Sequence, residues 1–184
     1  RQSDVFRSGI YFIGTKKDIE LEYTSGKASQ ERVLTSLNAP EHMKYRLLTQ
    51  HWFQPKSLRT MDERIRKIAR RHVEDMARLD GECEFYHSIA VHYPLRVIMS
   101  MMGLSEEAES FMMRLTQIVT NMDDPDLTGE PAPKTAEERA QRSRAISDEA
   151  SIFFNEVSTR RRAVPTDDVS TVIANAKVDG EPIS

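Results

Sequence analysis

Apolar side chains recur with a helical period along most of the chain. A stripe at about 61–80 consists of Ile65, Ile68, Ala69, Val73, Met76 and Leu79. A strongly apolar helix is expected at about 88–102, where Pro94 is an expected kink, and another helix, capped by Ser105, is expected to end at about 122. A long polar helix is expected at about 135–162. The pattern predicts a mainly α-helical fold.

Capping signals mark the expected helix starts. Residues 38–41 (Asn-Ala-Pro-Glu) supply an N-cap, a proline in the first turn and a glutamate at the third helical position. Residues 60–63 and 135–138 are capping boxes of the T-x-x-E kind. Residues 166–168 follow Pro165 and place acids where the helix dipole favours them.

Three stretches depart from the helical period. Residues 9–37 contain several Gly, Ser and Thr residues and predict a long loop, which at this length is usually functional. Residues 82–85 alternate polar and apolar and predict a short strand. Residues 123–134 are acidic and rich in proline, and are expected to form a second loop. No internal repeat is present, and the length of 184 residues suits one medium domain or part of a larger one.

The composition excludes several classes of protein. Hydrophobic residues make up 39% of the chain and charged residues 30%, which is typical of a soluble globular protein. The net charge of −3 argues against nucleic-acid binding. No apolar run approaches the roughly 20 residues that cross a bilayer. Cys83 is the single cysteine, and no secretory signal is visible, so we expect a cytoplasmic protein.

Both ends suggest a piece of a longer protein. Arg1 opens directly into a helix-like stretch, and Ser184 stops just after a turn, where another element should begin. We therefore expect further chain on both sides.

His42 and Arg46 form the most informative pair. They are four residues apart on one expected helix and therefore share a face. An anion between them would relieve their repulsion, and a guanidinium and an imidazole can together clamp a carboxylate or phosphate. Two solvated side chains are the alternative, and spacing alone favours that alternative.

Other reactive side chains have simpler explanations. Cys83 has acids on both sides, which disfavour a thiolate, so a small buried apolar role is expected. His72, His87 and His92 lack metal-ligand spacing, and His92 is expected to be a hydrogen-bonded core histidine. The dense basic stretch at 59–71 is either a solvated helix face or a docking surface for an acidic partner.

Five segments, in order, resemble the bacterial cytochromes P-450, a haem-thiolate family. Residues 36–46 resemble the start of the family's helix C, with its D-P-P-E-H-x-x-x-R pattern, and Trp-Phe-Gln-Pro follows at 52–55. Residues 80–85 resemble the strand after helix D, and 93–107 resemble helix E and the turn into helix F. Residues 165–180 resemble helix H and the turn before helix I. The residues in several of these segments are similar to those of the family's terpineol-hydroxylating branch.

The resemblance implies a partial cytochrome P-450 fold, helices B to H with one short strand. Residues 1–37 would be the end of helix B and the B–C substrate loop, 38–122 helices C to F, and 123–184 the F–G loop with helices G and H. No segment of this sequence resembles the family's acid–alcohol pair of helix I, its helix K with E-x-x-R or its cysteine loop. The chain is therefore expected to contain no catalytic residue and no metal ligand, and Cys83 lies in the wrong element to be the thiolate.

The resemblance also implies roles for particular residues. His42 and Arg46 match the positions that hold the propionates of haem b. Lys56 and Arg59 match the side that receives electrons from a ferredoxin. The expected haem and substrate pocket consists of Leu34, Leu37, Met112, Leu115, Thr116 and Val119.

The function implied for the complete protein is that of a haem-dependent, iron-containing monooxygenase. It would hydroxylate a small apolar substrate, either a monoterpene alcohol or an aromatic hydrocarbon. Dioxygen would be the oxidant, and electrons would come from NAD(P)H through a ferredoxin reductase and a ferredoxin. The alternative is a non-catalytic helical interaction or regulatory domain whose basic helix binds an acidic partner.

Overall fold

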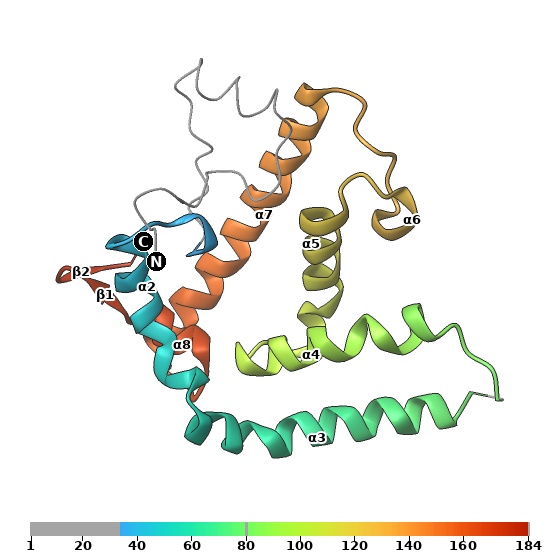
Figure 1. Cartoon of the computed structure of the whole chain (residues 1–184), viewed down its shortest axis with the longest axis horizontal. Helices are drawn as coiled ribbons and strands as arrows, with labels where there is room; N and C mark the ends of the chain where they lie inside the picture. Colours follow the sequence, from blue (N-terminus) through green and yellow to red (C-terminus); the bar gives the residue numbers. More distant parts are fainter. Residues whose placement is uncertain (1–33, 80, 184) are drawn as a thin grey trace.

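The computed structural model describes residues 34–79 and 81–183. The helix-like stretch expected at Arg1 and most of the expected loop at 9–37 lie outside these residues, as does the side chain of Ser36. The described residues are mainly helical, as the apolar pattern predicts (Figure 1).

The longer helices are α2 (Glu41–Thr49), α3 (Pro55–Ala77), α4 (His92–Met101), α5 (Glu109–Asn121) and α7 (Ala136–Ala163). The shorter elements are α6 (Pro125–Thr128), α8 (Val169–Ala174), the 3₁₀ turns η1 (Leu34–Ser36), η2 (Gln50–Phe53) and η4 (Glu106–Ala108), and the π turn η3 (Tyr86–Ala90). Strands β1 (Lys177–Val178) and β2 (Glu181–Pro182) form an antiparallel hairpin.

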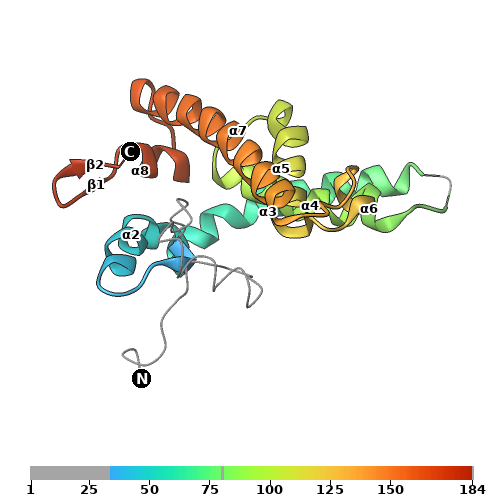
Figure 2. The same ribbon diagram turned by 90° about the horizontal axis from the view of Figure 1, so that it is seen from above.

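The helices contact one another in a continuous series. Helix α3 lies along one edge of the molecule with α4 on its inner side, α5 rises from α4, and the long α7 passes α5 (Figure 1). Helix α7 leads to α8, and α8 contacts α2, so the beginning and the end of the described chain lie together (Figure 2). No helix in the described part of the chain is long and apolar enough to cross a membrane.

The hydrophobic core lies where α4, α5 and α7 meet. Leu95, Met99 and Met112 are buried there. Half-buried hydrophobic residues pack against them, and these are Leu104, Ala108, Phe111, Met113, Leu115, Phe153 and Phe154. The rings of Phe111 and Phe153 lie 4.7 Å apart between centroids, which joins α5 to α7 through a close aromatic contact.

Two predicted helix starts are confirmed. Thr135 caps α7, because its Oγ1 accepts a hydrogen bond from the Glu138 backbone N–H at 3.1 Å. The Glu138 carboxylate in turn accepts from the Lys134 backbone N–H at 2.6 Å. Asp168 caps α8 by accepting from the Thr171 backbone N–H at 2.7 Å. Both caps satisfy N–H groups that a helix start leaves without partners.

Two other predicted starts are wrong in position. Helix α3 begins at Pro55, whose missing N–H suits the first helical position, and not near Thr60. Thr60 lies within the helix and its hydroxyl donates to the Ser57 carbonyl oxygen at 2.7 Å. Helix α2 begins at Glu41, with Pro40 rather than Asn38 at the cap position.

The predicted strand at 82–85 is also wrong. Residues 82–84 are irregular, and Phe85 enters the π turn. A strand requires a partner, and in the described residues none pairs with this segment. Instead the Glu84 carboxylate accepts from the His87 backbone N–H at 2.6 Å and supports the turn. The expectation that Cys83 is buried is wrong for the same reason, because the irregular segment leaves Cys83 exposed.

The β1–β2 turn is built from two residues with positive φ. Asp179 has φ 54° and Gly180 has φ 92°, with Lys177 opposite Pro182 and Val178 opposite Glu181. Positive φ at both central residues gives a twist that matches the two flanking strands. The hairpin places the Asp179 carboxylate near α2, where it forms an ion pair with Lys44.

A polar cluster around Asp168 joins the end of α4 to α7 and α8. Asp168 is almost fully buried and pairs with the Arg161 guanidinium, with 2.7 Å between Nε and Oδ2. Arg161 also donates to the Gly103 carbonyl oxygen, and the Ser170 hydroxyl donates to the Met102 carbonyl oxygen at 2.8 Å. Burial raises the pKa of Asp168, but hydrogen bonds from Thr166 and Thr171 and the charge of Arg161 outweigh it and lower that pKa.

We predict that Gly103→Ala destabilises the protein much more than Gly129→Ala. Both glycines have positive φ, 65° and 69°, so both substitutions introduce the same backbone strain of about 1 kcal/mol. Only at Gly103 would the new Cβ collide with other atoms, at 2.1 Å from the Asp168 carboxylate and 2.6 Å from the Arg161 guanidinium. We expect a total loss of about 3 kcal/mol at Gly103 from urea unfolding. Equal losses at the two sites would contradict the close packing of the Asp168 cluster.

Candidate functional site

The candidate site lies on one face of α2. His42 and Arg46 are one helical turn apart, as their spacing predicts. The first turn is held by hydrogen bonds from the His42 N–H to the Asn38 carbonyl oxygen at 2.9 Å and from the Met43 N–H to the Pro40 carbonyl oxygen at 3.2 Å. Helix α2 contains no buried residue, so its position depends on its contacts with neighbouring elements of the fold.

The α2 face presents hydrogen-bond donors beside apolar side chains. His42 is half-buried and Arg46 is exposed, and within residues 34–79 and 81–183 neither side chain has a hydrogen-bond or ion-pair partner. Met43 and Leu47, the next residue after each, are 48% and 56% exposed. A guanidinium and an imidazole flanked by apolar side chains fit the edge of a flat apolar molecule that carries carboxylates.

Helix α2 is held by the C-terminal hairpin and by α8. The Lys44 ammonium pairs with Asp179 in the β1–β2 turn. The hydrogen bond from Lys44 to Asp179, and then the charge of Asp179, raise the pKa of Lys44. Helix α8 contacts α2 directly, and α8 is fastened through the Asp168 cluster to α7. The pair on α2 is therefore positioned by residues more than 120 positions further along the chain.

The expected pocket residues come from two places. Leu34 and Leu37 lie at η1, which contacts α2, and Leu34 is 41% exposed while Leu37 is half-buried. The α5 residues Met112, Leu115, Thr116 and Val119 lie within an arc of about 100° on that helix.

Burial decreases along this α5 face. Met112 is in the core, and Leu115 packs against the core. The Thr116 hydroxyl donates to the Met112 carbonyl oxygen at 2.8 Å, and Val119 is 65% exposed. Only the C-terminal end of this face is therefore available to another molecule.

The expected docking residues are both exposed. Lys56 and Arg59 lie in the first two turns of α3, three residues apart and therefore on neighbouring positions of one face. Neither forms an ion pair or hydrogen bond with any residue that the structure describes.

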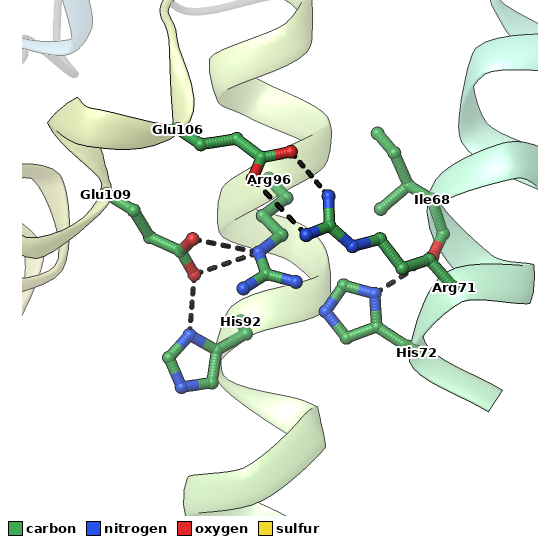
Figure 3. Close-up of polar contacts among 7 residues, drawn as sticks. All are labelled: Ile68, Arg71, His72, His92, Arg96, Glu106 and Glu109. Carbon is green, nitrogen blue, oxygen red and sulfur yellow. Dashed lines mark hydrogen bonds and ion pairs between the residues drawn. The ribbon is translucent and has the colours of Figure 1, made fainter. Parts of the chain in front are cut away.

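A charged cluster at the α4–α5 contact is not apparent from the sequence (Figure 3). The Glu109 carboxylate, with a side chain 15% exposed, accepts from Arg96 Nε at 2.9 Å and lies 2.7 Å from His92 Nδ1. Burial raises the pKa of Glu109, but the hydrogen bonds from Arg96 and His92 outweigh burial and lower that pKa. His92 is thus hydrogen-bonded, as expected, and half-buried rather than fully in the core.

A second group of side chains, beside the Glu109 cluster, joins α3 to η4 and α4. Arg71 forms a bidentate ion pair with Glu106 (Figure 3). His72 is buried and its Nδ1 lies 2.9 Å from the Ile68 carbonyl oxygen, so this nitrogen carries the proton. The His72 ring meets the Tyr93 ring edge-on at 5.6 Å between centroids. In the described part of the chain, no group of three or more His, Cys, Asp or Glu residues could hold a metal ion.

We predict that Glu109→Gln costs about 2 kcal/mol of unfolding free energy at neutral pH, because Arg96 and His92 lose their shared counter-charge. The matched control is Glu149→Gln, which removes an exposed partner of Arg114 and should cost less than about 1 kcal/mol. The folded-state pKa of Glu109 is lower than its ordinary value of 4.5, so its contribution is present above that pH and is lost as the pH falls below it. Urea unfolding at several pH values measures both effects. A difference between wild type and Glu109→Gln that grows below pH 4.5 would contradict this sign.

Comparisons with known proteins identify the family. No family model matches the chain. Among curated proteins, cytochrome P-450-terp of a Pseudomonas species is 40% identical over 151 residues, 82% of this chain and 35% of that protein. Linalool 8-monooxygenase of Pseudomonas putida is 25% identical over 182 residues, 99% of this chain and 42% of that protein.

A solved structure gives the same result for the fold. The crystal structure of CYP108D1 from Novosphingobium aromaticivorans superimposes with a TM-score of 0.72 and 32% identity, over 97% of this chain and 40% of that chain. The chain belongs to the bacterial cytochromes P-450 and has their fold over the matched residues. It spans 35% to 42% of the length of these relatives.

Proposed function

We propose that the protein containing this chain is a haem-dependent monooxygenase that hydroxylates a small apolar substrate. The observation that carries the proposal is the α2 face, where His42 and Arg46 lie one turn apart without partners in the described residues. The family membership supports it, because a haem carries two carboxylates on one edge and requires donors for them.

His42 and Arg46 would hold the propionates of haem b. The Arg46 guanidinium offers a planar fork of N–H donors that matches a carboxylate, and the His42 imidazole offers one further donor. Met43 and Leu47, exposed on the same helix, would lie against apolar atoms of the macrocycle. When bound, the haem supplies the activation of dioxygen, while the protein holds it and shields it from water.

The α5 face and η1 would supply the apolar wall of the substrate site. Leu34 and Leu37 contribute from the α2 side, and Leu115, Thr116 and Val119 contribute from α5, with Met112 supporting them from the core. The Thr116 hydroxyl is already used by the Met112 carbonyl oxygen, so this wall offers few polar partners. A monoterpene alcohol or a small aromatic hydrocarbon fits such a wall, and the name linalool 8-monooxygenase of one relative supports the first of these.

Electrons would reach the protein from NAD(P)H through a ferredoxin reductase and a ferredoxin in the cytoplasm. Lys56 and Arg59 are exposed cations without partners among the described residues, and they would contact acidic residues of the ferredoxin. Residues 1–37 would form the end of helix B and the B–C loop, 38–122 helices C to F, and 123–184 the F–G loop with helices G and H.

The test of the function is the carbon monoxide difference spectrum of the reduced complete protein. A Soret band at the position typical of thiolate-ligated haem would support the proposal. Its absence would overturn it and favour the alternative of a non-catalytic helical domain that binds an acidic partner through α3.

We predict that Arg46→Ala in the complete protein accelerates haem loss about tenfold, which corresponds to ~1.4 kcal/mol for one charge-assisted hydrogen bond. Transfer of haem to an excess of apomyoglobin measures the rate. The control is Arg66→Ala, which removes a guanidinium paired with Asp62 at 2.7 Å on α3. Equal haem retention in the two variants would remove Arg46 from the proposed site.

We also predict that Val119→Phe weakens terpene binding several-fold, because the added ring fills the exposed end of the α5 face. The size of the substrate-induced spectral shift, titrated with linalool, gives the dissociation constant. Thr120→Phe is the control, since Thr120 is also exposed but projects about 100° away around the helix. If both variants bind linalool as the wild type does, Val119 does not line the pocket.

A further inference from the structure

Lys44 lies on the side of α2 opposite to the donors His42 and Arg46. It is two residues from each of them, which places it about 160° away from both around the helix axis. The ion pair between Lys44 and Asp179 therefore leaves the two donors free. Helix α2 has no buried side chain, so core packing does little to fix its rotation about its own axis. A contact opposite the donors fixes that rotation, and with it the direction in which the donors point.

The backbone of the β1–β2 hairpin holds Asp179 at the turn. Asp179 and Gly180 form the turn with φ of 54° and 92°. At the open end of the hairpin, the Ile183 N–H donates to the Ala176 carbonyl oxygen at 3.2 Å. The Asp179 carboxylate therefore projects from a short closed unit that lies beside α2 (Figure 1).

Arg162, near the end of α7, fastens the base of this hairpin. Its Nε donates to the carbonyl oxygen of Ala174, shortly before β1, at 2.8 Å. A terminal nitrogen of the same guanidinium donates to the carbonyl oxygen of Ile183, just after β2, at 3.1 Å. One planar group thus bridges the segments that enter and leave the hairpin. Helix α7 packs on the hydrophobic core through Phe153, so Arg162 connects the hairpin to the core.

The Lys44–Asp179 ion pair can orient α2 while contributing little to the stability of the fold. Its side chains are 45% and 69% exposed. Ion pairs with such exposure contribute little to stability, and salt screens them. A small rotation of α2 nevertheless matters to His42 and Arg46, because a charge-assisted hydrogen bond depends steeply on distance and angle.

We propose that Asp179 and Arg162 are positioning residues for the propionate-binding face of α2. Arg162 fixes the hairpin, the hairpin presents Asp179 to Lys44, and this contact turns His42 and Arg46 towards the haem. The inference rests on the proposed function and assigns a part in it to residues that act through Lys44 and not by touching the haem.

The test is the rate of haem transfer from the complete protein to apomyoglobin in the variant Asp179→Asn. Asparagine removes the charge but tolerates the same positive φ, so the turn is preserved. Haem loss should accelerate about two- to fivefold at low salt, and the difference from the wild type should disappear at ~0.5 M salt. Lys44→Gln should give the same acceleration, because it removes the other half of the ion pair.

The matched control is Glu106→Gln, which breaks the ion pair between Arg71 and Glu106. This pair also joins distant parts of the chain, and its side chains are 53% and 68% exposed, but it lies on α3 and η4. The control should change the rate of haem loss less than about 1.5-fold.

Two further variants separate positioning from a general loss of stability. The double variant Asp179→Asn/Arg46→Ala should lose haem more slowly than the product of the two single effects predicts, because both changes act on the same hydrogen bonds. Arg162→Lys keeps the charge but not the planar fork that bridges the Ala174 and Ile183 carbonyl oxygens, so it should also accelerate haem loss.

Hydrogen exchange of the α2 amides, residues 41–49, provides a readout that does not depend on haem chemistry. Exchange should be faster in Asp179→Asn and unchanged in Glu106→Gln. Three results would overturn the inference: unchanged α2 exchange in Asp179→Asn, haem loss from that variant at the wild-type rate, or effects of Asp179→Asn and Arg46→Ala that multiply. These results are measured against a wild type with the thiolate spectrum, so they are distinguished from a failure of the proposed function, in which the wild type itself lacks that spectrum.

Discussion

The proposed haem site depends on two hydrogen-bond donors on α2, His42 and Arg46, that have no acceptor among the described residues. Several arginines in the described part of the chain are paired with an acid from another part of the chain. Arg71 pairs with Glu106, Arg114 with Glu149 and Arg161 with Asp168. His42 and Arg46 depart from this arrangement on a helix that carries exposed apolar side chains beside them. A carboxylate-bearing apolar molecule would satisfy both features at once.

The remainder of the fold fixes where these donors lie. Helix α2 has no buried residue of its own, so it depends on the β1–β2 turn and on α8 for its position. Helix α8 is joined to Arg161 of α7 by the buried Asp168 cap, and to the turn after α4 by the hydrogen bond from Ser170 to the Met102 carbonyl oxygen. The α4–α5 contact is in turn fixed by Glu109 with Arg96 and His92. Paired charges thus connect α2 to the hydrophobic core through elements distant in sequence.

Local signals predicted much of the fold. The period of apolar residues predicted the helices. The cap at Thr135 and the helix start marked by the acids at 166–168 were confirmed, because each signal is made by residues within a few positions. The strand predicted at 82–85 was wrong because alternation over four residues says nothing about a partner strand. The start of α3 was placed too late because Pro55 at the first helical position is as strong a signal as the T-x-x-E pattern at Thr60.

The candidate site, like the fold, could be predicted from the sequence only in part. The shared face of His42 and Arg46 follows from their spacing, whereas their ligand came from the resemblance to the cytochromes P-450. The Glu109 cluster could not be predicted, because His92 and Arg96 meet a carboxylate 13 to 17 positions away in another helix. Opposite charges are frequent in the sequence, and only the packing of α4 on α5 selects these partners.

A crystal structure of the complete protein with its haem measures the central claim most directly. We expect a guanidinium nitrogen of Arg46 and a ring nitrogen of His42 each to lie about 2.8 Å from a propionate oxygen. We also expect Met43 or Leu47 to contact apolar atoms of the macrocycle. Side chains of His42 and Arg46 that point into solvent, with the propionates held by other residues, would contradict the proposed haem site.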